Sequence, residues 1–304
     1  MEITTNPKKT FKKDTRRIGW SLVLHTVIAE FIALLTAFLV SLFTHDESAS
    51  LAIGQFVGTL GALGFMFLFF SRQNVIPQLF KKERSMSLKT FGLLLCVFFA
   101  ISSFGDLLYQ LLCKGLNLCG LQDTSYQIME MLNMDNWFMR LSVWVLAPIG
   151  EELIFRGLLM RKLQKYGKML ALVVPSILFG VMHGNFMQMI PATLVGLALG
   201  YVAMEYSVIW SILIHAINNI LLATLIPQWI ENSNGLQIAY NYVLPALCLV
   251  ASVILLICRR KQLAAWIREN KWQKPQLRWT IFTFGTLLFL ALHFIVAISC
   301  IQAV

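Results

Sequence analysis

Apolar residues occur along this chain in stretches of about 20 positions, separated by short polar segments. About 20 apolar residues in a helix cross the hydrocarbon core of a bilayer, so each stretch predicts a membrane-spanning helix. The stretches lie at 18–43, 51–71, 88–113, 137–159, 169–186, 188–204, 207–226, 238–258 and 279–302. The fifth and sixth are short and joined by a tight turn, and one end segment lying on the membrane would leave eight. We therefore predict an all-α fold, a polytopic transmembrane helix bundle of eight to nine spans.

The segments between these stretches alternate in charge. Of the 25 Lys and Arg residues, 22 fall before the first span or in the second, fourth and eighth loops. These residues are Lys8, Lys9, Lys12, Lys13, Arg16, Arg17, Arg72, Lys81, Lys82, Arg84, Lys89, Arg161, Lys162, Lys165, Lys168, Arg259, Arg260, Lys261, Arg268, Lys271, Lys274 and Arg278. Because basic loops stay on the cytoplasmic side of a membrane, we predict a cytoplasmic N-terminus.

Composition supports a membrane protein and excludes several other classes. Hydrophobic residues make up 58% of the 304 positions and charged residues only 13%, which rules out a cytosolic enzyme, a disordered chain and a small disulfide scaffold. The net charge of +10 follows from the basic loops, so we expect no nucleic-acid partner. The six cysteines include no CxxC pair, and we interpret most of them as packing residues.

Three ionisable residues lie within six positions of one another inside the fourth span. Glu151, Glu152 and Arg156 stand in the run EELIFR, where each charge is costly to insert and is a functional candidate. Glu152 and Arg156 are four residues apart on one helix face and can pair, which leaves Glu151 without a local partner. Glu151 is therefore the candidate proton acceptor, whereas a structural ion pair explains Glu152 and Arg156 equally well.

Two histidines fall on later spans at helical spacing from another notable residue. Phe179 and His183 form an FxxxH pair in the fifth span, and His215 and Asn219 form an HxxxN pair in the seventh. Residues four apart share a helix face, and imidazole and amide groups supply proton transfer and hydrogen-bond donors. Two other histidines, His25 and His293, are alone on their spans and are interpreted as packing residues.

These three motifs, in this order, resemble the CPBP family, also called the Abi or CAAX-protease family. EELIFR is similar to its EExxxR motif, Phe179–His183 to FxxxH and His215–Asn219 to HxxxN/D. The similar region covers about 145–222 of the chain. The resemblance implies an intramembrane glutamate-dependent endopeptidase acting on a membrane-associated peptide or protein, with a polar cavity inside the bundle.

The resemblance also implies a role for each matching residue. Glu151 would be the general base and His183 its partner in activating water, while His215 and Asn219 would form the oxyanion hole. Supporting residues would be Glu152, Arg156 and Phe179. The scheme needs neither cofactor nor metal, although a zinc site with one glutamate and two histidines is chemically possible. HExxH and GxSG motifs are absent, which argues against a zincin-like and a rhomboid-like protease.

The depth of each residue in the membrane tests this assembly. At 1.5 Å per residue, Glu151 lies about 15 Å from Arg161 and His215 about 15 Å from Glu205. The same count places His183 about 22 Å from Lys168, more than one helical turn deeper. We expect tilt, or a bend near Pro175 and Gly180, to absorb the difference.

Two other functions remain open. A binding or immunity protein without catalysis, as in bacteriocin self-immunity, would use the polar cluster only to hold helices together. A proton-coupled transporter would use Glu151 as a proton site, but no internal repeat supports it. We predict a basic tail over 1–17, a transmembrane domain over 18–302 and a multi-pass protein of a bacterial cell membrane, with the lipid bilayer as surroundings. The sequence leaves the oligomeric state open.

Overall fold

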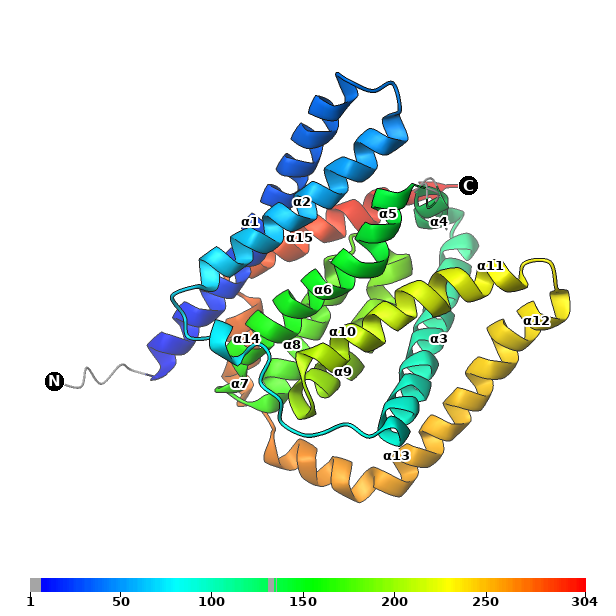
Figure 1. Ribbon diagram of the computed structural model, residues 1–304. Helices are drawn as coiled ribbons and strands as arrows, with labels where there is room; N and C mark the ends of the chain where they lie inside the picture. Colours follow the sequence, from blue (N-terminus) through cyan, green and yellow to red (C-terminus); the bar gives the residue numbers. More distant parts are fainter. Residues whose placement is uncertain (1–6, 131–133, 135) are drawn as a thin grey trace.

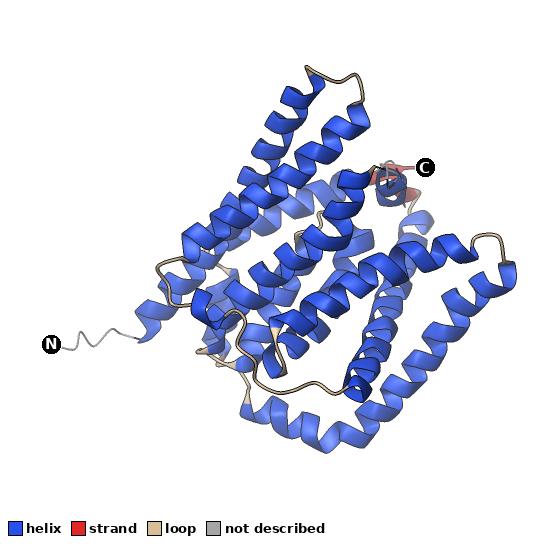
Figure 2. Ribbon diagram, viewed as in Figure 1, coloured by secondary structure: helices blue, strands red, loops and turns tan. Residues whose placement is uncertain are grey.

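The computed structural model describes residues 7–130, 134 and 136–304, without the side chains of 128–130 and 274. Almost all of these residues are helical (Figure 2). The first half of the described chain contains α1 (Pro7–Ser41), α2 (Glu47–Phe70), the 3₁₀ turn η1 (Ile76–Gln78), α3 (Leu88–Leu118), strand β1 (Leu121–Asp123) and α4 (Ser125–Glu130). The all-α prediction is confirmed.

One long helical segment over 137–164 then carries the predicted fourth span. We call this segment the fourth helix; it is distinct from α4. It comprises α5 (Trp137–Leu141), the π-helical η2 (Ser142–Leu146), α6 (Ala147–Glu152), the π-helical η3 (Leu153–Met160) and α7 (Arg161–Gln164). After it come α8 (Lys168–Val181), α9 (Phe186–Glu205), α10 (Val208–Ile217), π-helical η4 (Asn218–Leu225) and α11 (Ile226–Ile230). The chain ends with α12 (Asn234–Ile238), π-helical η5 (Ala239–Val243), α13 (Leu244–Glu269), α14 (Lys274–Ile281), α15 (Phe284–Ser299) and β2 (Ile301–Ala303).

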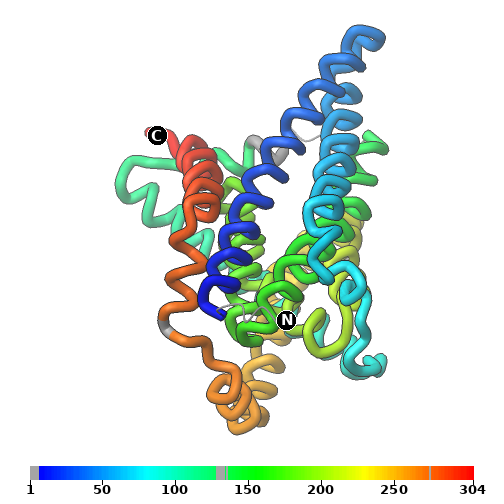
Figure 3. The backbone as a smooth tube through the Cα atoms, turned by 90° about the vertical axis from the view of Figure 1, so that its left-hand side faces the viewer, coloured from blue at the N-terminus to red at the C-terminus, as the bar shows by residue number. Residues whose placement is uncertain are grey.

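Helices α1 and α2 form a hairpin whose upper end extends beyond the other helices (Figures 1 and 3). Small residues allow the two backbones to approach closely, as is common for helices packed in membranes. A Cβ atom added at Gly58 would lie 2.8 Å from Cβ of Ala33, and one at Gly54 would lie 2.9 Å from Cβ of Ala37. The glycines of α2 therefore set the distance between the two helices.

Several helices begin directly after a polar residue that caps the free backbone N–H groups. Asp46 accepts a hydrogen bond from the backbone of Ala49 at the start of α2. Asn185 does the same for Gln188 at the start of α9. These caps mark where each helix begins, next to an apolar stretch of the sequence. The apolar stretches therefore predict these elements well.

Fewer described helices are long and apolar enough to cross a membrane than the eight to nine apolar stretches of the sequence. By length and composition, six described helices can cross a membrane, or seven if Pro275–Ile281 and Phe284–Ser299, bent by 62°, form one span. The predicted fourth span is a continuous helix, but three charged residues lower its apolar character. The predicted fifth span is α8, which has only 14 residues and is too short to cross a 30 Å core. The fold fits a multi-pass membrane protein.

The two short strands join distant parts of the chain. β1 and β2 pair antiparallel, with Leu121 opposite Ala303 and Asp123 opposite Ile301. This pairing fastens the last residues to the segment that follows α3, and places the end of α15 near α4 (Figure 1).

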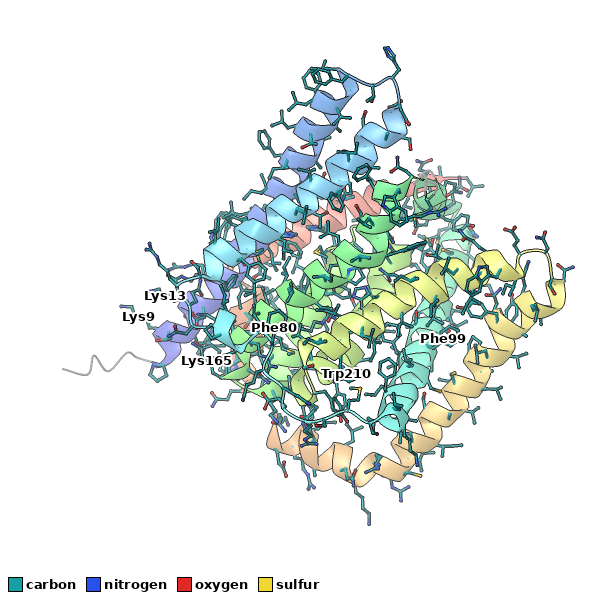
Figure 4. The ribbon with its side chains drawn as sticks, viewed as in Figure 1. Lys9, Lys13, Phe80, Phe99, Lys165 and Trp210 are labelled. Carbon is teal, nitrogen blue, oxygen red and sulfur yellow. The ribbon has the colours of Figure 1, made fainter. Side chains whose placement is uncertain are left out.

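The basic segments gather at one end of the bundle. Asp14 of α1 pairs with Lys162 and Lys165, and Glu205 at the end of α9 pairs with Arg84 and Lys168. Figure 4 shows Lys9, Lys13 and Lys165 at the same corner. α1 begins at Pro7, so the segment predicted as a tail is helical from that residue on. The side chain of Lys274 lies outside the described residues. The cytoplasmic assignment of this end stays a prediction.

Tyr166, in the turn before α8, stabilises the same end. Its hydroxyl donates to Oδ2 of Asp14 at 2.7 Å, and its ring meets Phe11 edge to face. Burial raises the pKa of Tyr166, and the hydrogen bond to Asp14 raises that pKa further. Tyr166 therefore stays a neutral donor that fixes the start of α1 against the turn before α8.

Candidate active site

Glu152 and Arg156 form an ion pair in the interior of the bundle. Nη1 of Arg156 lies 2.8 Å from Oε1 of Glu152, and both side chains are almost completely inaccessible to solvent, at 1% and 0%. Nη2 of Arg156 donates to the carbonyl oxygen of Gly196 on α9 at 3.2 Å. Because an unpaired buried charge is costly, this pairing is what allows the fourth helix to carry two charges at this depth.

Glu152 accepts hydrogen bonds at both of its oxygens. Besides Arg156, the hydroxyl of Ser211 donates to Oε2, and Nδ1 of His215 lies 3.1 Å from Oε1. Ser211 and His215 are four residues apart on α10, so they present one face to the carboxylate. A carboxylate with three donors spread over both of its oxygens is a fixed anionic anchor.

Glu151 is in a different environment from its neighbour. Its side chain is 20% exposed, and Oε2 lies 3.7 Å from Nε2 of His215. His215 therefore stands between the two glutamates, with Nδ1 toward Glu152 and Nε2 toward Glu151. The arrangement orients the imidazole through the buried glutamate and leaves Glu151 accessible.

The ring of Phe179 joins three of these residues. Its face lies under the guanidinium of Arg156, with Cζ 4.2 Å from the ring centroid. The imidazoles of His215 and His183 meet it edge to face, at centroid distances of 5.8 and 5.2 Å. Phe179 is itself 1% exposed. The first residue of the FxxxH motif thus sets the position of both histidines.

His183 lies just beyond the end of α8, in the turn that leads to α9. Its Nδ1 is 3.0 Å from the carbonyl oxygen of Phe179, and its own carbonyl accepts from Asn185 at 2.9 Å. Gly184 follows with φ +63°, a conformation that favours glycine. The partner expected for Glu151 is His183, whereas the histidine that the structure places beside Glu151 is His215.

Asn219 is fixed by contacts with the helix that carries the glutamates. Its side-chain N–H donates to the carbonyl oxygen of Val143 in η2 at 3.0 Å. Its side-chain oxygen accepts from Asn218 at 3.1 Å, and its backbone carbonyl accepts from Thr224. Asn219 lies in the π-helical η4, directly after α10. Wide turns of this kind are frequent at functional sites because they redirect side chains.

Sequence reasoning missed two groups of this cluster. The carbonyl of Gly196 has no signal in the sequence, since any residue supplies a backbone acceptor. Ser211 has a weak signal, because it precedes His215 by four residues and therefore shares its face. Both are recognisable only once α9 and α10 are placed beside the fourth helix.

Residues 133–221 match the family model described as type II CAAX prenyl endopeptidase Rce1-like. The chain carries an Rce1-like segment. The resemblance drawn from the three motifs is thereby confirmed, and the Rce1-like segment contains all seven residues singled out from the sequence. No curated protein and no solved structure matches the chain.

The Rce1-like segment forms the interior of the bundle. It runs through the fourth helix, α8, α9 and α10, and ends in η4 (Figure 1). Residues 133 and 135 of this segment lie outside the described residues. Within the described part of the chain, no group of three or more His, Cys, Asp or Glu side chains is placed to hold a metal ion.

Proposed function

We propose that this chain is an intramembrane endopeptidase that uses Glu151 to hydrolyse a peptide bond in a membrane-associated protein or peptide. The Rce1-like segment supports a protease of the CAAX endopeptidase type. The observation that carries the glutamate mechanism is the contrast between the two adjacent carboxylates. Both carboxylate oxygens of Glu152 accept hydrogen bonds. The side chain of Glu151 is instead partly exposed to solvent and lies beside the oriented imidazole of His215.

In this proposal Glu151 is the general base. It accepts a proton from a water molecule held with the help of His183, and the resulting hydroxide forms a bond to the amide carbon. The carbon–nitrogen bond then breaks, and the proton passes from Glu151 to the leaving nitrogen. The imidazoles of His183 and His215 both contact the ring of Phe179 edge to face. This common contact supports a shared role for the two histidines.

Stabilisation of the oxyanion is assigned to His215 and Asn219. Donors that are already oriented before the reaction stabilise the developing charge without reorganisation. His215 is oriented by Glu152 through Nδ1, which directs Nε2 toward Glu151. Asn219 is oriented by the carbonyl of Val143 on the helix of the glutamates. Glu152, Arg156 and Phe179 position these groups.

The proposed reaction uses no metal. A zinc site would need three protein ligands, and both oxygens of Glu152 are already occupied by Arg156, Ser211 and His215. We expect cleavage to continue after treatment with a strong chelator, and a loss that added zinc restores would contradict the metal-free scheme.

The expected substrate is a membrane-associated peptide or protein, with a CAAX-type C-terminus as one candidate, by analogy with the description of the family model. We propose a multi-pass protein of the cell membrane whose basic end faces the cytoplasm. The polar cluster lies about 15 Å along the helix from Arg161 at that end, so a substrate would have to enter the bundle to reach it.

The experiment that tests the function compares peptide termini in membranes and medium by mass spectrometry. Four strains are required: wild type, deletion, and the deletion complemented with Glu151→Gln or with Glu30→Gln. Glu30 is an exposed glutamate on α1, outside the cluster, and provides the matched control. We expect new termini in the wild type and the Glu30 variant alone. If the deletion complemented with Glu151→Gln regains both the peptide termini and the wild-type phenotype, the protease proposal fails. A binding protein then becomes the better account.

A further inference from the structure

Two cavities lie at the basic end of the bundle, away from the glutamate cluster. One has a volume of about 350 Å³ and the other about 430 Å³. Both are lined by Gln78, Arg161 and Gln164, so that Arg161 stands between them. Neither cavity includes a residue that we assign to the proposed reaction.

Arg161 is held rigidly between the two cavities. Its side chain is 2% exposed, although it lies at the end of the fourth helix. Nη1 donates to Gln164 at 3.1 Å and to Glu83 at 3.4 Å, and Nη2 donates to the carbonyls of Lys81 and Ala203. Its Nε is buried without a hydrogen-bond partner. An unused guanidinium N–H can donate a charge-assisted hydrogen bond to an anion such as a phosphate.

The charges around the two cavities differ in balance. Three basic side chains line the smaller cavity, from Arg161, Lys162 and Lys165, and no carboxylate does. Asp14 lies behind it and pairs with Lys162 at 3.2 Å and with Lys165 at 2.8 Å. Glu83 pairs with Arg161 at 3.4 Å, so two carboxylates face three cations, and positive charge remains. The larger cavity includes Glu83 and Glu205 and is mixed in charge.

A neutral acceptor completes the smaller cavity, which we call the Lys165 cavity. Nε2 of Gln73 donates to the carbonyl of Phe69, while its Oε1 is buried without a partner. An unpaired buried acceptor is costly, and a ligand hydroxyl would satisfy it. The adjacent Asn74 has φ 52°, which turns the chain sharply after α2 and brings Gln73 to the cavity wall.

The position of the Lys165 cavity indicates the source of its ligand. Its wall begins three residues after Phe70, the last residue of α2, which can span a membrane. The buried apolar residue Val75 is part of the cavity lining. A basic cavity where spans end lies at the level of lipid headgroups, and such pockets bind anionic headgroups. Figure 4 shows Lys165 and Phe80 at this end of the molecule.

We propose that the Lys165 cavity binds a phosphate that carries a neighbouring hydroxyl group, as in the headgroup of an anionic glycerol phospholipid. The phosphate contacts Lys165, Lys162 and Arg161, and the hydroxyl donates to Oε1 of Gln73. The same chemistry is offered by a soluble polyol phosphate such as glycerol phosphate. The site is independent of the glutamate cluster and does not rest on the proposed protease activity.

Native mass spectrometry of the full chain in detergent tests this site. Phosphatidylglycerol, phosphatidylcholine and glycerol phosphate are titrated separately, so that lipid and soluble sources are distinguished. The variant is Lys165→Glu and its matched control is Lys168→Glu. The two lysines are similarly exposed, at 51% and 47%, but Lys168 lines the mixed cavity instead. Both variants change the net charge equally.

We expect one phosphatidylglycerol to bind preferentially over phosphatidylcholine. Lys165→Glu should weaken the binding of phosphatidylglycerol about thirtyfold, because the substitution lowers the charge next to the phosphate by two units. Lys168→Glu should weaken this binding much less. Gln73→Leu, which keeps all charges, should reduce the preference for phosphatidylglycerol over a phosphate lipid without headgroup hydroxyls. Binding of glycerol phosphate with the same sensitivity to Lys165→Glu supports the site with a soluble ligand. Equal effects of the two lysine variants, or no preference for any phosphate with a hydroxyl, would overturn the proposal.

Discussion

Nε2 of His215 lies 3.7 Å from Oε2 of Glu151. The opposite ring nitrogen is fixed by Glu152, so the orientation of the imidazole toward Glu151 is set by a residue that solvent does not reach. The two adjacent glutamates thus have separable roles. Glu152 fixes the imidazole of His215, and Glu151 faces the side that solvent can reach. This separation is testable, because the same substitution should have different consequences at the two positions.

Glu151→Gln should abolish cleavage while the protein remains folded. The carboxylate is the proposed general base, whose removal costs about 10²–10⁴ in rate, and glutamine keeps the size of a side chain that is 20% exposed. Glu152→Gln should instead lower the thermal unfolding midpoint, because it leaves the buried Arg156 without a counterion. Cleavage assays and unfolding curves in the same detergent measure both effects. Equal loss of stability for the two variants would contradict the division of roles.

Arg156→Met should destabilise the protein by about 3–5 kcal/mol, since Glu152 would remain as an uncompensated buried charge. Arg156→Lys should recover only part of the loss, because an ammonium cannot stack over Phe179 and also reach Glu152 and the carbonyl of Gly196. Unfolding midpoints give the comparison. The matched control is Arg84→Met, whose 70% exposed side chain pairs with Glu205, and it should cost about 0–1 kcal/mol. A cost for Arg156→Met as small as this control would refute the claim.

The three motifs predicted which helices meet, but not the level at which they meet. By residue counting, His183 is more than one turn deeper than Glu151 and His215. The structure accounts for this difference without a large bend: Phe179, one turn earlier on α8, contacts Arg156 and His215, while His183 occupies the turn after the helix. Counting from Lys168 places Phe179 about 16 Å deep, which matches the two other residues. Spacing alone does not say which member of an i, i+4 pair lies at the level of the partner helix.

The remaining differences arise from tertiary contacts and from helix irregularity. The prediction of eight to nine spans counted the apolar stretch of α8 as a span, although its 14 helical residues are too few to cross the hydrocarbon core. Ser211 is an ordinary serine until α10 lies against Glu152. The π-helical turns around Asn219 have no clear sequence signal, although they decide where its amide points.

Ser211→Ala should lower stability by about 1–3 kcal/mol, because one oxygen of the buried Glu152 loses its donor. The imidazole of His215 should also lose part of its orientation, so that kcat falls while KM changes little. The control is Ser252→Ala on α13, a buried serine whose hydroxyl bonds within its own helix. Thermal unfolding and steady-state cleavage rates are measured for both. Identical behaviour of the two serine variants would show that the hydroxyl of Ser211 has no special role.

Gly58→Ala should separate α1 from α2. The added Cβ would lie 2.8 Å from Cβ of Ala33 and 2.6 Å from the carbonyl oxygen of Ala29, so backbone must move. Overpacking of this kind costs about 1–3 kcal/mol. Gly64→Ala in the same helix is the control, because its Cβ would meet no atom within 4 Å, and alanine favours the helix. The unfolding midpoint should fall for the first variant and stay level or rise for the second. The reverse order would rule out the close packing of the hairpin.

Asn219→Ala should reduce kcat by about 10²–10³ with little change in KM, as expected when one oxyanion donor is removed. The side chain is partly buried and bonded to Val143, so Asn219→Asp provides a second variant of the same shape in which the donor is replaced by an acceptor. Both variants should be inactive although their causes differ, because alanine lacks the group and aspartate repels the developing negative charge. Asn136→Asp is the matched control, since Asn136 caps α5 through its side-chain oxygen and aspartate keeps this capping oxygen. If Asn219→Asp cleaves as fast as the wild type, Asn219 is a structural link between η4 and η2 and the oxyanion donor must be sought on His215 alone.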